Sequence, residues 1–460
     1  MGPCPDARVE PPRRFLTRAR SAERDFAGRI YLSFRSTAPG ALLLALVLGW
    51  TSPASATDGH FLHGVGAVNS AMGGAGVAAR GDLLGSFYLN PAGIFSDRGS
   101  RVALGFEMMK AQRRTASDFM GFAGETESKA AFVPIPAFGW ATSLNENLTF
   151  GVGMLGIGGF GVDYPADPNN PVLGPRPNGF GQVYSNFQFM KISPTLAFRA
   201  GEKLLLGASL NLDWASLAVD PMPTASPAFD AGTGTAYYSR ATAADGAFGA
   251  GFQLGVIYQA TDALSVGASY SSPQWFQDFE YTSVYENPNL PNFQTAREFS
   301  FAMDVPAVYG AGFSLDRGNI LWNGDVRYIA YGSTEGFEKS GMDATGAVQG
   351  FGWEDILVLA TGVQLRAGEM LAVRAGYNFT QNPVPDAQSA FNVPAPAVVQ
   401  HHATVGLGLT FDNLGIDVGY YRAFENDITG PFQTPMGSMD VTNSMKEDSF
   451  LLSFSFSPGG

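Results

Sequence analysis

Apolar and polar positions alternate with a period of two along most of the chain from Arg101 onward. The clearest stretch is 403–411 (ATVGLGLTF), where apolar side chains at odd positions oppose small or hydroxyl-bearing residues at even positions. This period is typical of β-strands with one apolar and one polar face. Comparable stretches span 190–198, 204–214, 248–258, 264–270, 320–328, 371–379 and 450–456. The chain is therefore predicted to be all-β.

The connections between these strands alternate in length. Short ones are predicted at 143–147, 200–203, 260–263, 316–319, 366–369 and 412–414. Long ones, polar and rich in Pro and Gly, are predicted near 115–130, 161–186, 217–246, 281–296, 333–352, 383–398 and 427–446. This arrangement is typical of outer-membrane barrels and predicts about fourteen antiparallel strands. Pro134 and Pro136 interrupt the second strand, near 131–143, because proline cannot donate to a ladder.

Composition distinguishes a membrane barrel from a soluble sandwich, which would show the same alternation. Charged residues make up 15% of the chain and aromatic residues 13%, and there are 57 glycines. Soluble domains carry about 25% charged residues. No run of 18 or more apolar residues follows residue 56, which excludes a helical membrane protein. Together these features predict a transmembrane antiparallel β-barrel.

The first 56 residues have the order of an export signal. Eight arginines precede the apolar run 41–50 (ALLLALVLGW), and Ala54-Ser55-Ala56 forms an A-x-A cleavage site. Ten apolar residues are too few to span a membrane, which favours a signal peptide cleaved after Ala56 over an anchor. The only cysteine, Cys4, lies in this leader, so no disulfide is expected in the mature chain.

Cleavage would also change the charge of the chain. It removes 8 of the 28 basic and 4 of the 41 acidic residues, so the net charge moves from −13 to −17. Such an acidic chain argues against nucleic acid as a partner. The predicted organisation is a signal peptide at 1–56, an N-terminal plug at 57–99, for which the reasons follow, and a barrel at 100–460, located in the bacterial outer membrane.

Residues 64–93 are small, rich in Gly and Ala, and nearly uncharged. They show neither the stripe of a surface helix nor the alternation of a strand. Near their end, Pro91 fixes its own φ and pushes Asn90 toward extended geometry, so Asn90-Pro91-Ala92 is a rigid turn. A segment of this kind is expected to pack inside a larger object, as a plug in the barrel lumen.

The stretch 58–93 (DGHFLHGVGAVNSAMGGAGVAARGDLLGSFYLNPAG) resembles the mature N-terminus of the FadL family of outer-membrane transporters for long-chain fatty acids and aromatic hydrocarbons. The matching strings are His63-Gly64, the run 72–78 (MGGAGVA) and 90–93 (NPAG). The stretch 304–331 also resembles the middle hairpin of that family. The resemblance covers the mature chain, strongly in the plug and loosely in the strands.

The resemblance implies a fourteen-strand barrel with an N-terminal hatch and lateral release of substrate at a kinked third strand. It implies that Asn90, Pro91 and Ala92 lie against that strand and couple binding to opening; the alternative is a turn that only holds the plug. The third strand is expected at 148–161, and the alternative there is a glycine-rich strand that accommodates the plug without opening. The exit is placed at Gly156, Gly158, Gly159 and Gly161.

Three cations fall on inward faces by alternation: Lys191, Arg327 and Arg374. A lumenal cation could pair with the carboxylate of a fatty acid. The alternative is a lumenal charge network, and a neutral hydrocarbon would need no cation. The acidic members of such a network would be Glu107, Asp213, Asp325 and Asp417.

The four histidines form two sequence pairs, His60 with His63 and His401 with His402. The first pair is expected to begin the hatch on the periplasmic side and the second to open a strand near the outer face. The two pairs are not expected to converge, so no metal site is predicted. No cofactor and no catalytic residue are predicted either.

The favoured function is passive uptake of hydrophobic small molecules by a monomer surrounded by outer-membrane lipid and lipopolysaccharide. A general diffusion porin would need an open lumen, which the plug contradicts. A barrel lipase would need a partnered nucleophile, and inward-facing Ser209 and Ser269 have no histidine expected at matching depth. Apolar residues in the loops 161–186 and 217–246 could form a capture groove or pack on themselves.

Overall fold

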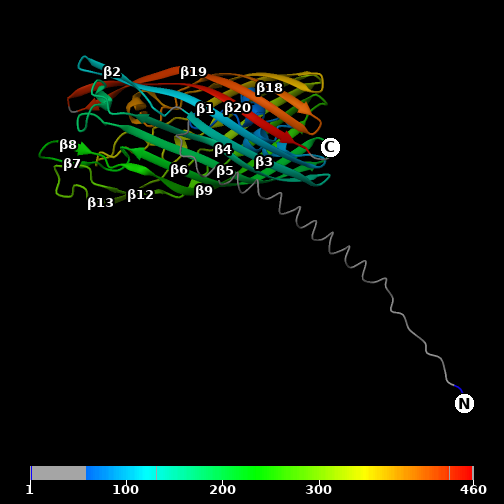
Figure 1. Cartoon of the computed structure of the whole chain (residues 1–460), viewed down its shortest axis with the longest axis horizontal. Coiled ribbons are helices and arrows are strands. Elements are labelled where there is room, and N and C mark those ends of the chain that lie inside the picture. The colour runs from blue at the N-terminus through cyan, green and yellow to red at the C-terminus, as the bar shows by residue number, and fades with distance from the viewer. Residues whose placement is uncertain (1, 3–57, 131, 435, 458–460) are drawn as a thin grey trace. The chain divides into compact units, whose positions relative to one another are not determined.

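The architecture was obtained from a computed structural model, which describes residues 2, 58–130, 132–434 and 436–457 (Figure 1). All elements below belong to the compact unit Ser52–Gly460. The predicted signal peptide and its cleavage site lie outside the described residues. No helix among the described residues is both long enough and apolar enough to cross a membrane.

Fourteen antiparallel strands form a closed wall, as the alternation of the sequence predicted. Each strand pairs with the next along the chain, β20 pairs with β1, and β9 pairs with β10 and so keeps the ring continuous. The wall strands are β1 (Ser100–Phe119), β3 (Phe132–Asn145), β4 (Leu148–Tyr164), β5 (Val183–Ala200), β6 (Leu204–Asp220), β9 (Ala241–Gln259), β10 (Leu264–Ser271), β14 (Val308–Arg317), β15 (Ile320–Ile329), β16 (Ile356–Ala367), β17 (Leu371–Thr380), β18 (His401–Phe411), β19 (Leu414–Thr434) and β20 (Gly437–Phe456).

The remaining strands are short and lie at the end of the barrel that carries the long connections. They are β2 (Phe122–Glu127), β7 (Ala228–Asp230), β8 (Thr235–Tyr237), β11 (Trp275–Phe276), β12 (Phe279–Val284) and β13 (Ala296–Phe301). Short helices occur at α3 (Gly66–Ala71), α4 (Leu83–Leu89), η1 (Pro91–Ile94), η2 (Pro171–Leu173), η3 (Tyr331–Ser333) and η4 (Asp386–Asn392). All six predicted short connections are turns between wall strands, at the opposite end.

Side-chain exposure alternates along the strands as a lipid-facing and lumen-facing pattern requires. On β18, Val405, Leu407 and Leu409 are exposed, whereas Thr404, Gly406 and Gly408 are buried. β16 alternates strictly over ten residues. The apolar faces therefore point outward and the small or polar faces point into the lumen, the reverse of a water-soluble sandwich.

Two of the predicted long loops are wrong, because they are paired strands. β19 and β20 remain in register from Leu414↔Phe456 to Thr434↔Gly437, so 427–446 is a tall hairpin. Likewise β1 continues to Phe119 and turns back as β2. In both places polar residues replace apolar ones on the outward face while the ladder continues, and the sequence pattern therefore looks like a loop.

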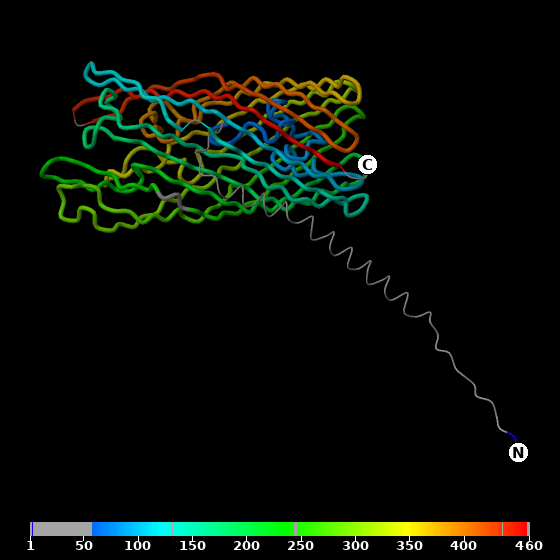
Figure 2. Tube along the Cα trace, viewed as in Figure 1, coloured from blue at the N-terminus to red at the C-terminus, as the bar shows by residue number. Residues whose placement is uncertain are grey.

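The N-terminal segment, residues 58–95, lies inside the barrel (Figure 2). α3 contacts β17 to β20 and β1, α4 contacts β1, β3 and β4, and η1 contacts β5, β6 and β9. Wall glycines permit this close approach: a Cβ on Gly362 or Gly376 would collide with the backbone at Met72. The small residues of the segment and the glycines of the wall thus fit together, consistent with a plug.

Candidate functional site: a break in the barrel wall

The wall is interrupted between the second and third barrel strands. Within the described residues, the ladder between β3 and β4 runs from Asn145↔Leu148 to Ala137↔Leu155 and stops there. Beyond that point β3 continues to pair with β1, as far as Phe132↔Lys110. β4 continues to pair with β5, as far as Tyr164↔Val183. One edge of each strand is therefore left without its neighbour.

Local sequence explains why the two strands separate here. The edge of β3 carries Pro134 and Pro136, which have no N–H to donate and are poorly suited to a central ladder. On β4, the register with β5 shifts between Gly156 and Gly158, so Ile157 forms a bulge. Bulges bend the strand that contains them and increase its twist. The prolines and the bulge lie opposite each other, at the point where pairing ends.

The N-terminal segment occupies part of the free edge of β4. The Leu62 N–H donates to the Ile157 carbonyl (3.0 Å), and the Gly159 N–H donates to the His60 carbonyl (2.8 Å). Phe61 forms an antiparallel bridge with Gly158. A Cβ on Gly158 would collide with the His60 carbonyl oxygen, so glycine is required for this close approach.

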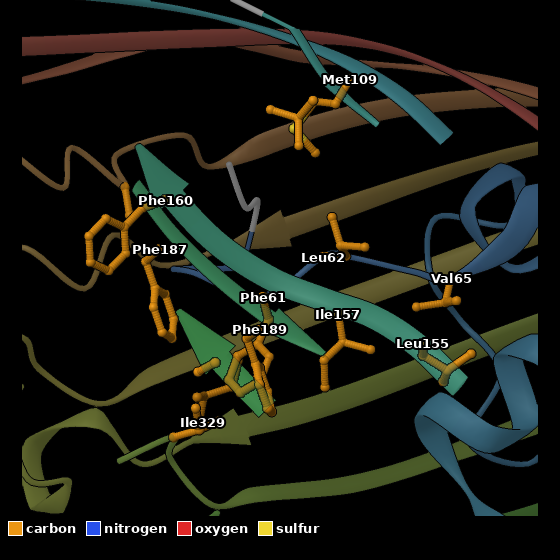
Figure 3. Packing of buried hydrophobic residues seen from close by; sticks show 14 of the residues in the cluster. Phe61, Leu62, Val65, Met109, Leu155, Ile157, Phe160, Phe187, Phe189 and Ile329 are labelled. Atoms are coloured by element: carbon orange, nitrogen blue, oxygen red, sulfur yellow. The ribbon is translucent and has the colours of Figure 1, made fainter. Parts of the chain in front are cut away.

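An apolar pocket lies beside this contact. Phe61, Ile157 and Phe189 form part of its wall (Figure 3). Lys191 and Gln253 supply polar atoms to the pocket. Its volume is about 40 Å³, well below the ~150 Å³ of an apolar cavity that admits benzene. In this conformation the pocket is too small for such a molecule, and Phe61 of the N-terminal segment is one of the side chains that line it.

A buried ion pair fixes the start of the N-terminal segment. Arg327 Nη2 lies 3.0 Å from Asp58 Oδ2 and also donates to the His63 carbonyl (3.1 Å). Both side chains are almost fully buried. Burial raises the pKa of Asp58 to about 6, although the Arg327 charge acts in the opposite direction. Arg327 thus holds the segment rather than standing free in the lumen.

His60 is enclosed by aromatic side chains from the loop end of the barrel. Its ring stacks on Phe337 with 5.2 Å between centroids, and its backbone N–H donates to the Tyr331 hydroxyl (2.9 Å). Burial lowers the pKa of His60 to about 3 and that of His63 to about 4. Both rings are therefore neutral at pH 7.

The other two predicted cations lie in different surroundings. Arg374 pairs with Asp417 (2.7 Å) and donates to Gln364, as in the charge network considered as the alternative. Lys191 is buried beside the apolar pocket, with Nζ 3.4 Å from Gln253 Oε1. Its register partner on β6 is the buried Asp213, an acidic member of the charge network considered as the alternative, although among the described residues no carboxylate oxygen lies within 4 Å of the Lys191 ammonium.

The expectation that Asn90-Pro91-Ala92 lies against the third strand is wrong. The Asn90 amide donates to the Val77, Val256 and Ala268 carbonyls, and η1 packs on β5, β6 and β9. Glycines in those strands permit this position, since a Cβ on Gly207 would collide with the Ala92 backbone and a Cβ on Gly255 with the Asn90 side chain. The N-terminal segment meets the free edge of β4 through residues 60–62 instead.

The expectation that the two histidine pairs would not converge is also wrong. His63 and His402 stack with 5.4 Å between ring centroids. The residues from 58 to 63 run through the lumen instead of starting at its periplasmic end, and this path brings the rings together. Among the described residues, no group of three or more His, Cys, Asp and Glu side chains could hold a metal.

Sequence reasoning missed the edge contact of residues 60–62. The only signal for it was the pair Gly158 and Gly159, since glycine inside a strand often marks close approach of another backbone. In the loops, Val172 and Leu173 pack with Val162 and Tyr164 in a small core of their own. A separate apolar pocket of about 30 Å³ includes Phe180, Met342 and Phe391.

Comparison with known proteins places this geometry in a family. The model of the family described as "Outer membrane protein transport protein (OMPP1/FadL/TodX)" matches residues 47–455. No curated protein sequence matches the chain significantly.

Solved structures share the fold at low sequence identity. The Pseudomonas putida toluene transporter TodX is 19% identical, with a TM-score of 0.65 over 86% of this chain and 99% of that one. A Pseudomonas aeruginosa FadL homologue is 16% identical, with a TM-score of 0.66 over 87% and 99%. The Ralstonia pickettii toluene transporter TbuX is 19% identical, with a TM-score of 0.61 over 86% and 99%. With the family match across nearly the whole chain, this protein belongs to the FadL/TodX family of outer-membrane transport proteins.

Proposed function

We propose that this protein takes up hydrophobic small molecules passively and releases them sideways into the outer membrane between β3 and β4. The observation that carries the proposal is the break in the wall at Ala137 and Leu155, beside an apolar lumenal pocket. Residues 60–62 occupy the free edge of β4 there. In this account they form the movable part of the hatch.

The physical chemistry of an apolar substrate supports a lateral route. Each CH₂ group gains about 0.8 kcal/mol when it leaves water for an apolar environment. A water-filled pore would offer such a molecule little, whereas a path from pocket to lipid keeps it out of water. The gradient alone drives uptake if the cell consumes the substrate.

Two substrate classes remain in the proposal, and Lys191 distinguishes them. TodX and TbuX are toluene transporters, and toluene has no charge. Lys191 beside the apolar pocket favours a substrate with a carboxylate, such as a long-chain fatty acid, because a buried cation and a carboxylate form a strong charge-assisted hydrogen bond. Replacing Lys191 with Met should weaken oleate binding at least tenfold and leave toluene binding unchanged. If the Lys191→Met variant and the native protein bind oleate equally, Lys191 does not contact the substrate.

The lateral route is tested by Gly158→Arg. The new side chain cannot coexist with the His60 carbonyl and would fill the space between the free strand edges. The expected result is a folded barrel with uptake reduced to background. The matched control is Gly232→Arg between β7 and β8, where the backbone is not left-handed and a Cβ meets only the Asp230 carboxylate, at 3.3 Å. Full uptake by Gly158→Arg would refute lateral release.

A general diffusion porin is the alternative function, and the packing of residues 58–95 argues against it. α3, α4 and η1 together contact strands around most of the wall. The purified protein should therefore give no steady large currents in planar bilayers. Enzymatic activity forms no part of the proposal. Ser209, one of the serines considered as a lipase nucleophile, has its hydroxyl 2.7 Å from the hydroxyl of Thr195.

A further inference from the structure

The apolar pocket beside the break must enlarge before it can hold a substrate. Its volume of about 40 Å³ is well below the ~150 Å³ of an apolar cavity that admits benzene. Most of its lining residues belong to wall strands that are hydrogen-bonded to their neighbours in the ladder, and two others, Gln274 and Val305, bond to each other through their backbones. The N-terminal segment supplies Phe61, Tyr88 and Leu89. We therefore expect the N-terminal segment to be the part of the wall that moves.

Tyr88 connects this pocket to the free edge of β4. Its side chain lines the pocket and is half-buried, whereas its neighbours in α4, Phe87 and Leu89, are buried. The Tyr88 hydroxyl donates to the Leu62 carbonyl at 2.5 Å. The N–H of Leu62 donates in turn to the Ile157 carbonyl of β4 at 3.0 Å. The Tyr88 hydroxyl thus holds Leu62 in its position on the strand edge.

The backbone at Tyr88 is held in place by the wall. Its carbonyl accepts a hydrogen bond from Gln253 Nε2 (3.1 Å), and Gln253 Oε1 accepts one from the Lys191 ammonium (3.4 Å). These two contacts fix the orientation of the Gln253 amide, because an ammonium only donates and a carbonyl only accepts. The adjacent Phe87 ring packs on Gly153, where a Cβ would lie 2.7 Å from Cγ of the ring. A molecule that fills the pocket therefore acts on the side chain of Tyr88 and leaves its backbone in place.

We propose that Tyr88 couples filling of the apolar pocket to release of Leu62 from β4. A molecule larger than the present cavity displaces the Tyr88 ring, and the hydroxyl then leaves the Leu62 carbonyl. With this bond broken, fewer hydrogen bonds hold residues 60–62, and they leave the strand edge more often. Tyr88 is a positioning residue, because it acts on the exit through Leu62. This role rests on the proposed lateral release and names the residue that transmits occupancy of the pocket to the exit.

Thermodynamic linkage makes the coupling visible in binding alone. If substrate binding breaks the Tyr88–Leu62 bond, a chain that lacks the bond binds the substrate more tightly by the same factor. A hydrogen bond of ordinary net strength corresponds to about a fivefold change in affinity. Tyr88→Phe removes only the hydroxyl and should therefore bind oleate and toluene about fivefold more tightly than the native protein. A hydroxyl that served only the packing of α4 would give no such gain.

The test combines binding of labelled oleate to the purified full-length protein with amide hydrogen exchange of Leu62 and Gly159. In the native protein, saturating oleate should accelerate this exchange about fivefold. Tyr88→Phe should exchange faster without ligand and respond to oleate by less than about twofold. The matched control is Tyr281→Phe, whose hydroxyl donates to the Leu217 carbonyl (3.1 Å) and which does not line the pocket. This variant should match the native protein in both measurements.

Three results would overturn the role of Tyr88. They are equal oleate affinity in Tyr88→Phe and the native protein, an equal response of exchange to oleate in both, and the same gain of affinity in Tyr281→Phe. In each case lateral release stands, provided that oleate accelerates exchange in the native protein. If oleate binds the native protein and leaves exchange at Leu62 unchanged, the movable segment of the proposed function fails together with the role of Tyr88.

Discussion

Asp58→Asn isolates the contribution of the buried ion pair that holds the N-terminal segment. The substitution preserves shape and removes the charge that faces Arg327 at 3.0 Å. Loss of one partner of a buried pair costs about 3–5 kcal/mol because the other charge stays buried. Asp325 lies two residues from Arg327 on the same face of β15 and partly compensates the unpaired Arg327 charge. We therefore expect Asp58→Asn to weaken attachment of the segment by the lower value, about 3 kcal/mol.

A loss of about 3 kcal/mol shifts the equilibrium between the attached and released segment roughly 150-fold. Amide hydrogen exchange measures this equilibrium directly, because the Leu62 and Gly159 N–H groups form the hydrogen bonds between the segment and β4. Their exchange should accelerate strongly in Asp58→Asn, while amides of β16 and β18 stay protected. The control is Asp97→Asn, which breaks the exposed pair with Arg199 and should cost less than about 1 kcal/mol. Unchanged exchange at Leu62 in Asp58→Asn would show that the ion pair does not hold the segment.

Two further predictions concern the hatch. Because burial lowers the pKa of His60 to about 3 and of His63 to about 4, attachment is strongest above pH 6.5 and weakens as the pH falls toward 4. The pKa of Asp58 is raised to about 6, so this carboxyl opposes the trend over pH 4–6, but the two histidines have the larger effect. Amide hydrogen exchange of residues 60–62 should therefore be faster at pH 5 than at pH 7. His60→Gln should make this exchange less dependent on pH. Asn90→Ala removes the side chain that donates to three carbonyls and should destabilise the packing of η1 by about 2–3 kcal/mol, measured as increased proteolysis of residues 88–96 with the barrel intact.

Much of the fold could be predicted because successive residues of a barrel strand face lipid and lumen in turn. Val405, Leu407 and Leu409 face lipid and Thr404 faces the lumen, so a strand is visible wherever the outward side is apolar. The pattern fails where the wall rises out of the membrane. There the outward face is polar, whereas Ile428, Val441 and Met445 are buried on the inward face, and the β19–β20 hairpin resembles a loop in sequence although its ladder is complete.

The candidate site was predictable only in part. Pro134, Pro136 and the glycines of β4 indicate where pairing is weak, and the break lies there. The partner that fills the edge could not be predicted, since residues 60–62 reach Gly158 across almost a hundred residues of chain. Alternation places Arg327 in the lumen, but it does not reveal that Arg327 already forms an ion pair with Asp58.

The central claim is that substrate leaves between β3 and β4, and a reversible cross-link across the break tests it most directly. A Cβ on Gly156 lies 2.9 Å from Ile135 Cγ2, so Ile135→Cys/Gly156→Cys places two sulfurs within bonding reach across the gap. The only natural cysteine is Cys4. The control Ser100→Cys/Thr142→Cys links register partners in the intact β1–β3 seam, where the two native hydroxyl oxygens lie 2.8 Å apart.

Uptake of labelled oleate and toluene is measured in cells with each variant, oxidised and then reduced. The account predicts that oxidation abolishes uptake through Ile135→Cys/Gly156→Cys, that reduction restores it, and that the control transports in both states. Native uptake rates with the cross-link shown complete by mass spectrometry would contradict lateral release.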